Sequence, residues 1–100
     1  MSKENRLTCS QEDYLESIYL IRKNKGEVRI TDIALFMNTS KPSANKAVLL
    51  LKEEGLIDHE KYGLISLTKK GELLADDIYF RHKTLMDFLI NTLKVEPKLA

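Results

Sequence analysis

Apolar residues recur along this chain at the spacing of an α-helix in four stretches, and two short runs of another kind interrupt them in its second half. From Tyr14 to Ile21 the apolar positions lie mostly three or four apart, which predicts a helix that ends near Asn24. Residues 10–13, Ser-Gln-Glu-Asp, have the form of a capping box. A first amphipathic helix is therefore expected over about residues 10–24.

Two further helices are predicted in the middle of the chain. The alternation in residues 27–30 predicts a short edge strand, and residues 31–32, Thr-Asp, are then expected to cap a second helix. A tight turn leads into a third helix, where Ser40 has the side chain of an N-cap and Pro42 gives up an N–H that the first turn does not use. Gly55 is the natural left-handed residue at its end.

The third helix divides into two faces. Its small and aliphatic residues share the face that is expected to pack: Ala44, Ala47, Val48 and Leu51. Pro42, Ser43 and Lys46 fall on another face, so small polar and basic groups at the helix entry would be free to meet base edges in a major groove. An ordinary amphipathic surface helix has the same periodicity and caps, so the context must decide.

That context comes from the second half of the chain. Two apolar-rich runs, residues 56–59 and 64–68, flank a polar tip and predict a β-hairpin. Thr68 is expected to cap a long final helix, whose apolar stripe from Leu73 to Leu93 has a far end that packs on the first helix or on another subunit. The fold class is mainly α with a small hairpin, in the order of a winged helix-turn-helix.

Size and composition indicate a single folded domain in the cytoplasm. The chain has 100 residues, of which 43% are hydrophobic and 31% charged. No apolar run approaches the roughly 20 residues of a membrane span, and residues 1–6 lack the apolar core of a secretory signal. The single cysteine, Cys9, can close no intrachain disulfide.

The net charge is only +1, so a nucleic-acid hypothesis depends on where the cations lie. They gather between the third helix and the start of the last one: Lys41, Lys46, Lys52, His59, Lys61, Lys69 and Lys70. An enzyme is not expected, because no serine or cysteine has an evident partner base and there is no glycine-rich phosphate loop. No small-molecule substrate and no membrane are expected as partners.

Six short segments give the chain a wider similarity. They are residues 12–19 (EDYLESIY), 29–34 (RITDIA), 41–43 (KPS), 54–57 (EGLI), 67–71 (LTKKG) and 81–82 (RH). In their order and spacing, residues 10–95 resemble the diphtheria toxin repressor family of metal-dependent transcription regulators, and more closely its manganese transport regulator branch. The resemblance implies a repressor of metal-uptake genes, which binds a double-stranded DNA operator and whose full-length form is a homodimer.

The family's DNA contacts correspond to residues near the start of the third helix and on the wing. With two neighbours included, the expected set is Ser40, Lys41, Pro42, Ser43, Asn45, Lys46, Lys61 and Tyr62. This agrees with the chemistry of these residues, because hydroxyls can donate or accept, Pro42 can touch a thymine methyl group, and Lys46 can reach a guanine edge or a phosphate.

The resemblance also implies metal ligands at Asp13, Glu16 and His82. The two carboxylates lie three apart on the first helix and so point the same way, and His82 would join them if the last helix packs there. Carboxylates with one imidazole suit Mn(II) or Fe(II) better than zinc. Asp13, where the iron-responsive branch usually has methionine, favours manganese.

Each of these residues also has an interpretation without metal. Asp13 can be the third-position acid of the capping box, Glu16 a solvated side chain, and His82 a hydrogen-bonded core histidine. The alternative functions are then a metal-independent winged-helix DNA-binding protein, or a protein-interaction module that docks through its long final helix.

Family members continue past this length into a dimerisation helix that bears further ligands. We therefore expect the chain to be a fragment with an incomplete metal site: residues 1–75 form the winged helix-turn-helix domain, and residues 76–100 begin the linker and dimerisation region. Met86 stands where relatives often place a glutamate for a second metal, which leaves the number of metals open.

Overall fold

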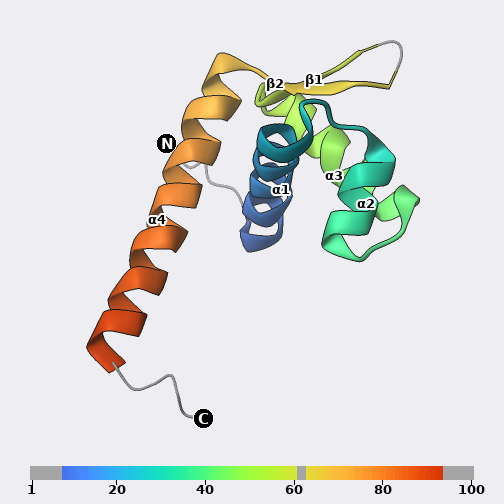
Figure 1. The fold of residues 1–100 in the computed structure, drawn as a ribbon. Coiled ribbons are helices and arrows are strands. Elements are labelled where there is room, and N and C mark those ends of the chain that lie inside the picture. Colours follow the sequence, from blue (N-terminus) through green and yellow to red (C-terminus); the bar gives the residue numbers. More distant parts are fainter. Residues whose placement is uncertain (1–7, 61–62, 94–100) are drawn as a thin grey trace.

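The computed structural model describes residues 8–60 and 63–93, which form four helices and a two-stranded hairpin. In chain order these are α1 (Cys9–Lys25), α2 (Ile30–Met37), α3 (Lys41–Glu53), β1 (Ile57–His59), β2 (Ile65–Leu67) and α4 (Lys69–Leu93). Figure 1 shows α1 in the middle, with α2 and α3 on one side, α4 on the other and the hairpin at one end. The predicted fold class and order of helices are confirmed.

The first helix begins earlier than its pattern predicted. Its N-cap is Thr8: the Thr8 hydroxyl accepts from the backbone N–H of Gln11, and the Gln11 side chain accepts from the N–H of Thr8. The prediction of a capping box at residues 10–13 is therefore wrong. The two reciprocal hydrogen bonds of the capping box form between Thr8 and Gln11, two residues earlier in the chain. Asp13 lies inside the helix and is not its capping acid.

The predicted edge strand at residues 27–30 is reduced to one bridge, between Val28 and Ile65. It ends there because α2 begins at Ile30, with Arg29 as its N-cap, and the Arg29 N–H binds the Asp32 carboxylate at 2.9 Å. The prediction that residues 31–32 precede this helix is wrong, because the helix begins at Ile30 and includes both of them. Asp32 stands at the third helical position and stabilises the helix start from there.

The third helix matches its prediction. The Ser40 hydroxyl accepts from the N–H of Ser43 at 3.2 Å, and Pro42 stands in the first turn. The tight turn before it is made by Asn38 in the left-handed conformation, at φ 54°. At the other end Gly55 adopts φ 77°, as expected. Helices α2 and α3 are thus fixed in a helix-turn-helix by local backbone chemistry.

The hairpin pairs Ile57 with Leu67 and His59 with Ile65 in antiparallel register. The predicted cap at Thr68 is confirmed, because its hydroxyl accepts from the N–H of Gly71 and donates to the carbonyl of Gly55. Thr68 therefore ties the start of α4 to the end of α3.

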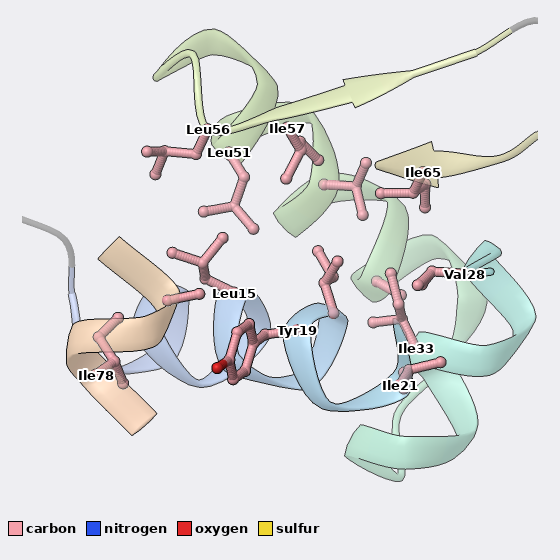
Figure 2. Packing of buried hydrophobic residues seen from close by; sticks show 14 of the residues in the cluster. Leu15, Tyr19, Ile21, Val28, Ile33, Leu51, Leu56, Ile57, Ile65 and Ile78 are labelled. Carbon is pink, nitrogen blue, oxygen red and sulfur yellow. The ribbon is translucent and has the colours of Figure 1, made fainter. Parts of the chain in front are cut away.

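One core joins all the elements. Figure 2 shows side chains of α1 packed between Ile78 of α4 and the aliphatic residues of α2, α3 and the hairpin. The expected packing face of α3 is buried: Ala44, Ala47, Val48 and Leu51. This leaves the opposite side of α3 outside the core.

The second half of α4 extends beyond this core. Every described side chain from Phe80 to Asn91 is exposed, and several of them are large and apolar: Phe80, Leu85, Met86, Phe88, Leu89 and Ile90. The far end of α4 was predicted to pack either on the first helix or on another subunit. It does not pack on α1, and the contact with another subunit stays a prediction. Among the described helices, none is long and apolar enough to cross a membrane.

Candidate nucleic-acid interface and metal-binding residues

The predicted reading face of α3 is open to solvent. All six predicted contact residues at its entry are exposed: Ser40, Lys41, Pro42, Ser43, Asn45 and Lys46. The Ser40 hydroxyl, which caps the helix, also donates to the hydroxyl of Ser43 at 3.0 Å. The two hydroxyls are therefore held side by side, next to the Pro42 ring.

A hollow of about 340 Å³ borders this face on the α1 side. Ser43 and Lys46 line it from α3, together with Leu50, while Ser10 and Gln11 line it from the first turn of α1. The sequence did not indicate that α1 adjoins the reading face, because residues more than thirty positions apart meet here only through the packing of the two helices.

The predicted wing contacts, Lys61 and Tyr62, lie outside the described residues. The hairpin on either side of these two residues is described. The N–H of Glu60 donates to the carbonyl of Leu64 at 2.8 Å, and Gly63 has a φ of 84°. Arg29 was missed by the sequence reasoning. Its guanidinium lies beside Gly63, close enough that a Cβ there would stand 3.5 Å away, and so adds positive charge at the wing.

Charge is distributed unevenly along α3. Lys41 and Lys46 lie at and near its entry, whereas Glu53 and Glu54 stand at its end. The entry also carries the positive end of the helix dipole. Positive charge is therefore concentrated at the first two turns of α3, whereas its last turn carries Lys52 together with the two glutamates.

A ladder of polar pairs joins α1 to the antiparallel α4. Its rungs are Arg22–Glu72 at 2.6 Å, Tyr19–Asp76 at 2.8 Å and Glu16–His82 at 2.8 Å. The hydrogen bond from the Tyr19 hydroxyl to Asp76, followed by burial, raises the pKa of Tyr19. Lys23 adds a cation over the Tyr19 and Tyr79 rings, 5.2 Å from each centroid. These pairs fix which residues of α1 and α4 face each other.

Two of the three predicted metal ligands are brought together, and the third is not. The Glu16 carboxylate meets Nδ1 of His82, beside a hollow of about 280 Å³ that Met86 and Asp87 also line. Asp13 is exposed and is not part of that lining, and the described residues contain no group of three or more donors able to hold a metal ion. Of the three predicted ligands, Glu16 and His82 thus hydrogen-bond to each other, whereas Asp13 forms a hydrogen bond with neither of them.

Comparison with known families shows to which family of winged helix-turn-helix proteins this chain belongs. The family model described as iron dependent repressor, N-terminal DNA binding domain, matches residues 6–65. This chain belongs to that family. The match covers α1, α2, α3, β1 and the first residue of β2, the part of this repressor domain that presents the reading face.

Two relatives of this repressor domain are named HTH-type transcriptional regulator MntR. The protein from Lysinibacillus sphaericus (strain C3-41) is 42% identical over 82 residues, which are 82% of this chain and 59% of that protein. The protein from Oceanobacillus iheyensis is 38% identical over the same share of this chain and 56% of its own length. The chain thus spans under three fifths of the length of these two transcriptional regulators.

Solved structures agree with the fold. The manganese regulator SloR is 33% identical with a TM-score of 0.74, over 90% of this chain and 42% of that one. The DNA complex of MepR from Staphylococcus aureus has a TM-score of 0.73 over 96% of this chain and 70% of that one; at 18% identity this likeness shows the fold alone.

The donors at the α1–α4 junction of this repressor domain fit a divalent cation in type. Glu16 is only 15% exposed and offers carboxylate oxygens, and the imidazole of His82, 48% exposed, lies in direct contact with it. Two such groups leave most of a six-ligand shell to other donors. Glu16 and His82 therefore fit part of a binding site for a divalent cation.

Proposed function

We propose that this chain is the DNA-binding part of a transcriptional repressor, and that the outward face of α3 enters the major groove of a double-stranded operator. One observation carries the proposal: the entry of α3 presents hydroxyl and ammonium groups to solvent while its opposite face is buried in the core. Ser40 also caps the helix, but capping requires neither the hydroxyl of Ser43 nor the ammonium group of Lys46 at this end.

Each group at the entry has a role in this interface. The paired hydroxyls of Ser40 and Ser43 can donate to or accept from base edges, and the Pro42 ring can contact a thymine methyl group. Lys46 can bind a guanine edge or a phosphate. Lys41 and Asn45 flank these contacts, and the wing residues Lys61 and Tyr62 are proposed to reach the backbone of the same operator.

The proposed regulator acts as a homodimer in the cytoplasm, where its operator DNA lies. Residues 1–75 form the DNA-binding domain in this proposal, and residues 76–100 begin the dimerisation region. The exposed apolar residues in the second half of α4 support this division, because burying them against another subunit is favourable. Two reading helices would then match the two halves of a palindromic operator.

We further propose that the regulator responds to Mn(II) or Fe(II), with Glu16, His82 and Asp13 as part of the ligand set. A bound divalent cation would supply positive charge between α1 and α4. Glu16 and His82 already hold the two helices in register, so the chain's own contribution is to keep one carboxylate and one imidazole together. The carboxylate donors favour these hard or borderline cations over zinc.

Mapping by NMR tests the DNA proposal. We expect a 20-base-pair duplex of mixed sequence, added to the 15N-labelled chain at low salt, to shift amides of residues 40–49 and of the hairpin flanks. A single strand of the same sequence is the control, and it should cause much smaller shifts at residues 40–49. Shifts confined to the second half of α4, or none at all, would contradict the proposal and favour a protein-interaction module instead.

Calorimetry with MnCl₂ tests the metal proposal separately. We expect the wild-type chain to release or absorb heat on binding Mn(II), and its affinity for the metal to fall at least tenfold in Glu16→Ala and in His82→Ala. Even residues that only hydrogen-bond to a metal ligand commonly change the metal affinity by ten- to a hundredfold. Asp77→Ala is the control, because this exposed carboxylate accepts a hydrogen bond from Arg81 and takes no part in the contact between Glu16 and His82. Equal heats in all variants, combined with intact DNA binding, would favour the metal-independent regulator.

A further inference from the structure

The outward face of α3 carries one residue that the proposed contacts do not use. Leu49 is 53% exposed, although its neighbours Val48 and Leu51 are fully buried in the core. It follows Pro42 by seven residues and Lys46 by three, so all three side chains lie on the same face of the helix. A large apolar side chain is therefore presented in line with the groups proposed to read DNA.

Leu49 is the apolar residue between the charged residues of that face. Lys46 lies one turn before it, and the exposed Lys52 and Glu53, which carry opposite charges, lie three and four residues after it. An uncharged aliphatic side chain at this position neither attracts nor repels a phosphate, so it is free to meet an apolar group of a base. The helix rises about 10 Å between Pro42 and Leu49, which is within the roughly 12 Å width of a major groove.

We propose that Leu49 is a specificity-determining residue that contacts the C5-methyl group of a thymine. This inference rests on the proposed DNA-binding function and extends its readout from the first turn of α3 to the third. Thymine is the base that offers an apolar group in the major groove, so an exposed leucine selects it by excluding water from both surfaces. Leu50, which is 40% exposed, lines the hollow beside α1 instead.

Selection from a random duplex library with the full chain provides the test DNA. We expect the sequences enriched by the wild-type chain to contain a position at which thymine is preferred. The sequences enriched by Leu49→Ala should show no preference for thymine at that position. Leu73→Ala removes a leucine of α4 that is even more exposed, at 64%, and is the matched control that should keep the wild-type preference. Circular dichroism verifies that both variants fold.

Replacing that thymine with deoxyuridine then removes only the methyl group. Burying one methyl-sized group contributes about 0.8 kcal/mol, so the wild-type chain should lose about fourfold in affinity while Leu49→Ala loses none. If both proteins respond equally to the replacement while still binding the duplex, the Leu49 proposal is overturned and the DNA-binding function stands. If the library yields no enrichment over a Lys46→Ala chain, both proposals are overturned.

Discussion

Replacing Gly71 with alanine should destabilise the fold by about 3 kcal/mol, the upper range for overpacking a filled site. In most helices this change stabilises, because alanine is the better helix former by up to about 1 kcal/mol. Here a Cβ at residue 71 would overlap the carbonyl oxygen of Leu56, far inside the van der Waals contact distance of the two atoms. That carbonyl is held in place by the N–H of Thr68 at 3.0 Å, so it has little freedom to move away.

Urea unfolding followed by circular dichroism measures this effect. Lys69→Ala, two residues earlier on the exposed side of α4, is the matched control and should change the free energy of unfolding by less than about 0.5 kcal/mol. An unchanged or increased stability in Gly71→Ala would show that α4 does not start against the end of α3 as described. The position of α4, and with it the Glu16–His82 contact, would then need revision.

Features that depend on neighbours in the chain were predictable from the sequence. The cap of α3 is one example, since the Ser40 hydroxyl needs only the N–H of Ser43 and a proline that tolerates the first turn. The cap of α4 at Thr68 is another. The start of α1 was misplaced because two cap-like residues, Thr8 and Ser10, stand close together there, and only Thr8 has the reciprocal partner Gln11. Ser10 lies inside the helix, which begins at Cys9.

Features that depend on how helices pack were not predictable in detail. Helical spacing showed that Asp13 and Glu16 lie on the same side of α1, but it could not show which of them meets His82. That choice follows from the register of α1 against α4, which the Tyr19–Asp76 and Arg22–Glu72 pairs fix. The α3 part of the candidate DNA interface was predictable because it lies on a single helix, whereas the candidate metal site lies between two.

Reversing the charge of Lys46 should weaken duplex binding by ten- to a hundredfold at low salt. A hydrogen bond to a charged group contributes about 1.5–3 kcal/mol, which corresponds to this range, and the new carboxylate would also repel nearby phosphates. The loss should shrink at higher salt, because one fewer counterion is released when the protein binds. The salt dependence of log affinity should therefore be shallower by about one unit of slope.

The fluorescence anisotropy of a labelled duplex, titrated with wild-type, Lys46→Glu and Lys83→Glu chains over a series of salt concentrations, measures this most directly. Lys83 is the matched control, because it is an exposed lysine of α4 that pairs with Asp87. Helix α4 lies on the other side of α1 from α3 (Figure 1). If the outward face of α3 binds DNA, Lys46→Glu loses affinity and salt dependence while Lys83→Glu stays close to the wild type. Equal behaviour of the two variants would contradict the proposed interface.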